Sequence, residues 1–258
     1  MSGWLHELPL WLLVIAIFAA TFLVAAAIYW AVVTLAVGEE RAHTFSSVSS
    51  GMLPPMGLLF GLLVGFVASQ VWTNVDRAQL AVDREASALR TTVLAAEDFP
   101  GEPDARIRVL IDSYILDAVD REWPAMAEGR ATLMVPPASL ALGLRLALSL
   151  NPQNEGQKVA QREMVTSLEN ALDARRQRII LSDSPVNWVK WLGVIIVGML
   201  TMLTIAFVHI ANRRATAIAM GIFAAAMATS LVMIAAQERP FRGDFAVKAD
   251  LLLEVKPN

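Results

Sequence analysis

The sequence predicts an all-α membrane protein in which four transmembrane helices accompany a helical domain outside the membrane. Of the 258 residues, 56% are hydrophobic and only 17% are charged, whereas about a quarter are charged in soluble domains. Four long segments contain no Asp, Glu, Lys or Arg. Between them, apolar residues recur every three or four positions, and no strand-like alternation is sustained.

Each uncharged segment is long enough to cross a bilayer as a helix, which takes roughly 20 residues. The segments are 8–38, 42–75, 191–212 and 215–237. Only Arg213 and Arg214 separate the last two, which indicates a tight, basic turn. The expected organisation is spans one and two in 8–75, an extramembrane domain in 76–187, spans three and four in 188–237, and a C-terminal tail in 238–258.

The domain holds 17 acidic and 13 basic residues, a net charge of −4. Four crossings place it on the same side of the membrane as both termini. Basic residues near the span ends are Arg77, Arg84, Arg90, Arg175, Arg176, Arg178, Arg239, Arg242 and Lys248 on that side, against Arg41, Arg213 and Arg214 on the other. Because basic loops stay in the cytoplasm, this bias favours a cytoplasmic domain.

Tryptophans lie near the predicted span ends, where indole rings prefer the headgroup depth. We expect Trp11, Trp30, Trp72, Trp188 and Trp191 to act as interfacial anchors.

Within the domain, one helical face continues directly from span two and predicts a single helix from Met52 to Asp98. That face consists of Val75, Ala78, Val82, Ala86, Leu89, Val93 and Ala96. Asp104 is expected to cap a second helix that reaches about Met126. Short apolar turns are expected over 138–150, and a long helix follows Asn151 and ends at 183–185.

Catalytic and metal-binding patterns are missing from the sequence. There is no cysteine, and the three histidines, His6, His43 and His209, are far apart. No metalloprotease, phosphate-loop or nucleophile-elbow motif occurs. We therefore expect no enzyme, no metal site and no cofactor. A net charge of −3 also argues against a nucleic-acid partner, which would require a basic surface.

Span two carries the most informative pattern. Gly57, Gly61, Gly65 and Ser69 place a small residue at every fourth position, which allows helices to approach closely. The neighbouring face changes from apolar to polar towards the domain and consists of Leu58, Leu62, Phe66, Ser69 and Thr73, with Gln70 beside it. Such a helix suits a ring around a pore. Equally, the small residues suit packing of span two within its own four-helix bundle, and periodicity alone leaves both open.

Three segments resemble the bestrophin-like family of bacterial membrane proteins. They are Gln70–Trp72 with Asp83–Leu89, Glu122–Met126, and Glu238–Asp244 after the last span. The resemblance covers nearly the whole chain and implies a multi-pass protein of the bacterial inner membrane.

A more distant resemblance to bestrophins falls on span two, from Pro54 to Leu62 and at 72–74. It implies that Pro54, Leu58 and Leu62 occupy the hydrophobic neck of a pore. Bestrophins are pentameric channels with four spans per subunit and a helical cytosolic region between spans two and three, so the same organisation is implied here. The chain lacks the acidic run that binds calcium in animal bestrophins, and we expect no calcium site.

The leading hypothesis is a homo-oligomeric, pentameric ion channel in which span two lines the pore. Its partners are membrane lipid, further copies of the chain and a permeant inorganic ion. The competing hypothesis is a non-conducting scaffold or regulatory membrane protein whose helical domain docks a partner.

Overall fold

The computed structural model describes residues 9–35, 39–184 and 186–256. All regular secondary structure in these ranges is helical, so the all-α prediction is confirmed. The chain forms two compact units, the first from 1–72 with 185–238 and the second from 73–184 with 239–258. Three predicted boundary residues, Leu8, Gly38 and Pro185, lie outside the described residues.

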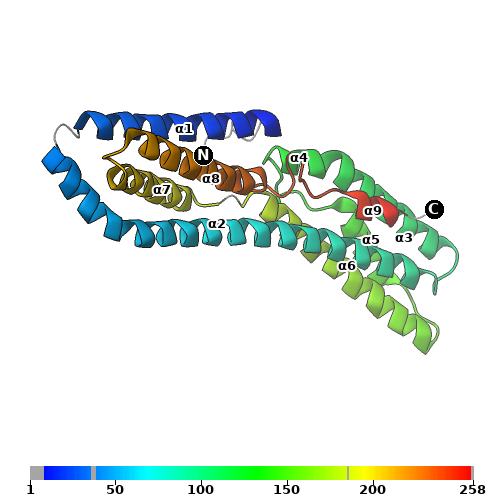
Figure 1. Cartoon of the computed structure of the whole chain (residues 1–258). Coiled ribbons are helices and arrows are strands. Elements are labelled where there is room, and N and C mark those ends of the chain that lie inside the picture. The colour runs from blue at the N-terminus through cyan, green and yellow to red at the C-terminus, as the bar shows by residue number, and fades with distance from the viewer. Residues whose placement is uncertain (1–8, 36–38, 185, 257–258) are drawn as a thin grey trace. The chain divides into compact units, whose positions relative to one another are not determined.

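The first unit contains the four helices that are long and apolar enough to cross a membrane, as predicted. They are α1 (Leu10–Leu35), the first part of α2 (Glu39–Ala96), α7 (Trp188–Val208) and α8 (Arg213–Ala236). Helix α1 packs along α8 and also contacts α7, and α7 packs against α8 (Figure 1). Asn212 caps α8 because its side-chain oxygen accepts the backbone N–H groups of Arg214 and Ala215.

Helix α7 approaches its neighbours most closely at Gly198. A Cβ atom placed there would lie 2.7 Å from Met227 Cε of α8 and 3.2 Å from a ring carbon of Phe60 of α2. The Phe60 and Phe223 rings are 5.1 Å apart, centroid to centroid, and add an aromatic contact between α2 and α8. Gly198 was not singled out from the sequence, yet a larger residue there would push α7 away from both helices.

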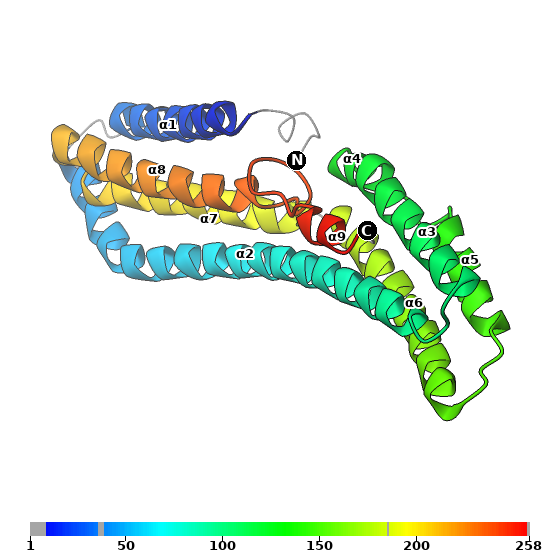
Figure 2. The same cartoon turned by 90° about the vertical axis from the view of Figure 1, so that its right-hand side faces the viewer.

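Helix α2 runs without interruption from Glu39 to Ala96. The predicted continuity from Met52 is therefore confirmed, but the helix begins earlier than expected and ends at Ala96, two residues before the expected Asp98. It contains Pro54 and Pro55, and near its N-terminal end it bends, as Figures 1 and 2 show. Proline is the usual cause of such a bend, because it removes a backbone N–H and its ring clashes with the preceding turn.

The second unit is a helical domain built on the remainder of α2 (Figure 2). Its other helices are α3 (Glu102–Asp117), η2 (Ala118–Glu122), α4 (Trp123–Ala127), α5 (Ala138–Ser149), α6 (Glu155–Ser182) and α9 (Asp250–Glu254). Helix α5 packs against both α3 and α6. The predicted apolar face of α2 is buried in this core from Ala78 to Ala96, and Val75 is half-buried.

Three local predictions need correction. Gly101, with φ of 95°, occupies the N-cap of α3, so Asp104 is no cap; it lies in the first turn and accepts a hydrogen bond of 2.9 Å from Arg108 Nε. Residues 138–149 form one helix in place of short turns. Trp191 is only 4% exposed and its Nε1 donates to Glu238 Oε1 at 3.1 Å, so it is a buried residue and not a lipid-facing anchor.

Candidate functional site

The predicted pore-lining residues form a stripe along the membrane part of α2. The exposed fractions of Leu58, Leu62 and Phe66 are 64%, 48% and 71%. The packing of α2 inside the first unit uses other positions, among them Phe60 and Val67. The described residues therefore leave the stripe uncovered. Its exposed members are Pro54, Leu58, Leu62, Phe66, Ser69 and Thr73, and Gln70 is half-buried.

The small-residue face beside this stripe is also open. Among the residues that the structure describes, no atom outside the helix's own neighbouring turns lies within 4 Å of a Cβ placed at Gly57, Gly61 or Gly65. The same test at Gly198 finds two atoms of Met227 closer than 3.0 Å. Among the described residues, the close approach is therefore made by Gly198 of α7, and none of them packs against Gly57, Gly61 or Gly65 of α2.

Gln70 lies at the edge of the stripe. Its side-chain oxygen accepts a hydrogen bond from Lys190 Nζ, in the first turn of α7. This bond holds the amide towards α7. The sequence did not indicate this contact.

A second polar feature is a cluster of four charged residues inside the helical domain. Arg178 and Glu85 have fully buried side chains and form a two-pronged ion pair, with Nε–Oε2 at 2.7 Å and Nη2–Oε1 at 2.9 Å. Arg178 Nη2 also donates to Glu122 Oε2 at 2.9 Å. Arg175 Nε donates to the other oxygen of Glu122 at 2.7 Å. Two positive and two negative groups neutralise each other, which is what allows charges to be buried.

Uncharged side chains complete this cluster. Tyr114 donates its hydroxyl hydrogen to Glu85, and the guanidinium carbon of Arg178 lies 4.5 Å from the ring centroid of Trp123. Burial, reinforced by the negative charge of Glu85, raises the pKa of Tyr114 well above its ordinary value. Burial by itself would lower the pKa of Arg178, but Glu85 outweighs it and holds the pKa above its usual range. Both groups therefore keep their protons.

The three segments that carry the family resemblance meet around this cluster. Glu85 comes from the first segment, and Glu122 and Trp123 come from the second. Phe241, from the third, packs edge-on against Trp123 with ring centroids 5.7 Å apart. The segments are far apart in sequence, and the structure brings them together in the core of the domain.

Arg175 and Arg178 are not among the functional residues expected from the sequence, where they are grouped with the charges near the membrane. Both are buried, so they do not contribute to the basic surface on the domain side. A signal was available, because both continue the buried face of α6 that runs through Met164, Leu168 and Ala171. A charged residue at an apolar position of a helical repeat indicates a buried ion pair.

The comparisons with known proteins agree with this fold. The family model of the Bestrophin-like domain matches residues 19–252. Two crystal structures of a bacterial Bestrophin homolog from Klebsiella pneumoniae, one of them a point mutant, are similar to the chain. The first has a TM-score of 0.66 and the mutant 0.70, each at 13% sequence identity and each covering 94% of this chain and 95% of the other. No curated protein matches the sequence. The family match extends over nearly the whole chain, and the protein therefore belongs to the Bestrophin-like family.

Proposed function

We propose that the protein is a bestrophin-type ion channel of the bacterial inner membrane, assembled as a homopentamer with α2 lining a central pore. The observation that supports this most is the open stripe on α2, where large apolar side chains and three glycines lie side by side without a partner inside the described part of the chain. On a membrane span such a face meets either lipid or a further copy, and the open glycines, which allow helices to approach closely, favour a further copy.

The two flanks of the stripe suit a ring of identical helices. Successive residues of an α-helix are about 100° apart, so Gly57 lies to one side of Leu58 and Leu59 to the other. Leu59 is 46% exposed, and a Cβ placed at Gly57 has no neighbour within 4 Å in the structure as described. A flank of glycines on one copy can receive the larger side chains of the next. Such head-to-tail contacts close into a ring when the rotation between copies permits it.

In such a ring the stripe provides two environments along one axis. Leu58, Leu62 and Phe66 form an apolar constriction, which can block ions by losing its water. Ser69 and Thr73 follow as a hydroxyl-lined section that remains wet. The gate of the channel is therefore proposed at the leucines, and a permeant inorganic ion is the expected cargo.

The cytoplasmic location of the domain is also part of the proposal. Without the buried Arg175 and Arg178, the exposed basic residues near the span ends still favour the domain side. On the domain side they include Arg77, Arg84, Arg90, Arg176 and Lys190. On the other side are Arg213 and Arg214, the first two residues of α8.

Electrical recording from purified protein in planar bilayers tests the proposal. The wild type should carry ionic current, and Leu62→Ala should increase the current at least several-fold by widening the constriction. Leu23→Ala is the matched control, because Leu23 is 70% exposed on α1 and lies outside the proposed pore.

The oligomer mass, measured by native mass spectrometry, decides between the two hypotheses. A ring of five supports the channel. A monomer or a two-fold dimer that carries no current under any ion, pH or potential would overturn it and favour the non-conducting scaffold.

A further inference from the structure

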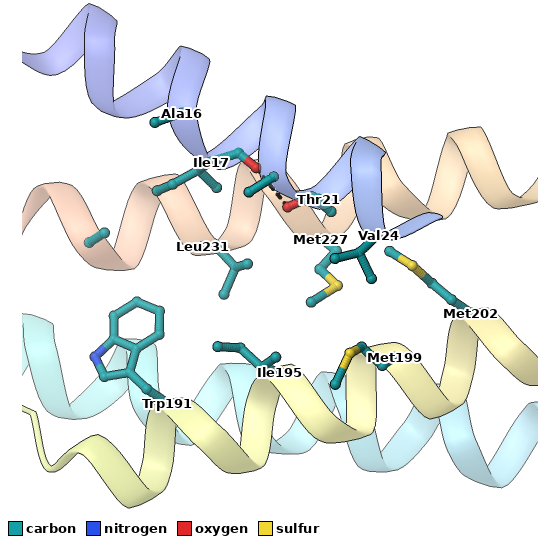
Figure 3. Close-up of a pocket in the computed structure, with 12 residues that line it drawn as sticks. Ala16, Ile17, Thr21, Val24, Trp191, Ile195, Met199, Met202, Met227 and Leu231 are labelled. Atoms are coloured by element: carbon teal, nitrogen blue, oxygen red, sulfur yellow. Dashed lines mark hydrogen bonds between the residues drawn. The ribbon is translucent and has the colours of Figure 1, made fainter. Parts of the chain in front are cut away.

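The membrane unit contains an apolar cavity of about 340 Å³ between α1, α7 and α8. Figure 3 shows its walls, in which Ile195 and Met199 of α7 face Met227 and Leu231 of α8. This volume is more than twice the roughly 150 Å³ of an engineered apolar cavity that accommodates benzene. It falls within the range of about 300–1,000 Å³ that is usual for ligand sites.

The lining offers nothing to a polar ligand. Its hydroxyl group, on Thr21, already donates to the carbonyl oxygen of Ile17 at 2.8 Å (Figure 3). Its indole N–H, on Trp191, already donates to Glu238 at 3.1 Å. The remaining side chains are aliphatic groups and methionines, whose flexible thioethers adapt to an apolar occupant. The occupant must therefore be hydrocarbon.

The depth of the cavity matches one leaflet of a bilayer. Along α7 it extends from Trp191 to Met202, about 16 Å at 1.5 Å per residue. Trp191 lies in the first turn of α7, so the cavity runs from that end of the span inwards. The hydrocarbon core is about 30 Å thick, and half of it is the length available to one acyl chain.

One wall of the cavity is open and the other is closed. Ala20 and Val24 of α1 are exposed, whereas Met202, Met227 and Leu231 are buried. Surrounding lipid therefore has access past α1. Lys190 precedes Trp191 and is exposed, and its bond to Gln70 uses one of three ammonium donors. Lys190 is not part of the lining, but it shares the first turn of α7 with Trp191, and a cation at that depth attracts the phosphate of a lipid headgroup.

We propose that this cavity binds one acyl chain of a bilayer phospholipid, with the phosphate near Lys190. The lining belongs to α1, α7 and α8 and contains no residue of α2, and the bond between Lys190 and Gln70 links the site to the edge of the stripe. The proposal does not depend on channel activity. Bound lipid fills the space between α1 and its neighbours and stabilises their packing.

Native mass spectrometry of protein released from nanodiscs of phosphatidylglycerol and phosphatidylethanolamine tests this site. The wild type should retain one phospholipid per chain. Ala20→Phe fills the cavity and should reduce retention at least ten-fold, and Ala16→Leu, a smaller change in the same lining, should give an intermediate loss if the first variant does not fold. Ala26→Phe is the control, since Ala26 is exposed on α1 and is not part of the lining.

Lys190→Met should keep the retained lipid but remove any preference for phosphatidylglycerol. Equal retention in Ala20→Phe and Ala26→Phe, or none in the wild type, would overturn the proposal. A retained free fatty acid would show that the source is not a phospholipid. A smaller oligomer in Ala20→Phe with unchanged lipid would show that a neighbouring copy fills the cavity.

Discussion

The two halves of helix α2 differ in the large side chains that they leave exposed and in the charge that they enclose. In the membrane half, Leu58 and Phe66 are 64% and 71% exposed, although both are large and apolar. In the domain half, Glu85 is 0% exposed, although it is charged. One uninterrupted helix thus leaves apolar groups uncovered at one end and encloses a carboxylate at the other.

The difference comes from where each half finds its partners. Within one chain, Glu85 meets Arg178 and Tyr114, so this carboxylate finds its partners in a single copy. The leucine and glycine faces of the membrane half find no partner in the described part of the chain, and lipid or further copies must cover them. Stability of the domain and assembly of the oligomer are therefore expected to respond to different substitutions.

The largest effect is expected at the buried ion pair. Glu85→Ala leaves Arg178 charged and partly unpaired in the core, which should lower the free energy of unfolding by about 3–5 kcal/mol. This decrease can be measured by denaturant unfolding in detergent, with circular dichroism as the signal. The double variant Glu85→Leu with Arg178→Met should recover much of the loss, because it removes both charges. A single variant as stable as the wild type would mean that the pair is not buried.

The next effect separates assembly from folding. Gly61→Leu should abolish the oligomer and leave the monomer folded, whereas Gly198→Leu should unfold the membrane unit because Met227 and Phe60 occupy that space. Gly221→Leu on α8 is the control, since a Cβ there meets nothing within 4 Å of the described atoms. Native mass and thermal unfolding distinguish the three. Normal assembly of Gly61→Leu would contradict the ring.

A smaller effect is expected at high pH. The folded state keeps Tyr114 protonated, because its pKa is raised. In the unfolded chain the phenol ionises near pH 10. Above about pH 10 the folded chain therefore keeps the phenol proton that the unfolded chain has lost. The free energy of unfolding is unaffected by ionisation of this group below about pH 10 and falls as the pH rises further. Tyr114→Phe should lose this alkaline dependence, measured as the difference in unfolding temperature between pH 8 and pH 11. An identical slope in both proteins would exclude the tyrosine as its origin.

The smallest effect is expected for Lys190→Met, which removes an exposed bond to Gln70. Surface contacts of this kind contribute only about 0–1 kcal/mol. Thermal unfolding should therefore change by a few degrees at most. A change as large as that of Glu85→Ala would show that the membrane half also depends on a polar contact inside one chain.

Much of the fold could be predicted from the sequence because two patterns in it are strong. Long uncharged runs indicated the spans, and the apolar repeat from Ala78 to Ala96 indicated both the continuity of α2 and its buried face. The stripe residues on α2 could also be named, since they share one side of a regular helix. Their role in a pore remains a prediction.

The contacts that join distant segments could not be read in the same way. Arg178 reaches Glu85 and Glu122 across 93 and 56 positions of sequence, and no local pattern fixes which acid it meets. Trp191 has the sequence position of an interfacial anchor, but it is buried and its indole N–H donates to Glu238, 47 positions along the chain, a contact that no local pattern predicts. The close approach at Gly198 likewise depends on side chains of two other helices.

The continuity of α2 also constrains how the gene for this protein can change in length. Inserting one residue between Trp72 and Glu85 would turn the stripe by about 100° relative to the carboxylate and shift it by about 1.5 Å. Seven inserted residues complete almost two turns and restore the angular phase to within about 20°. Insertions of near-whole turns therefore keep the stripe and the carboxylate in phase along α2, whereas other insertions or deletions change that phase.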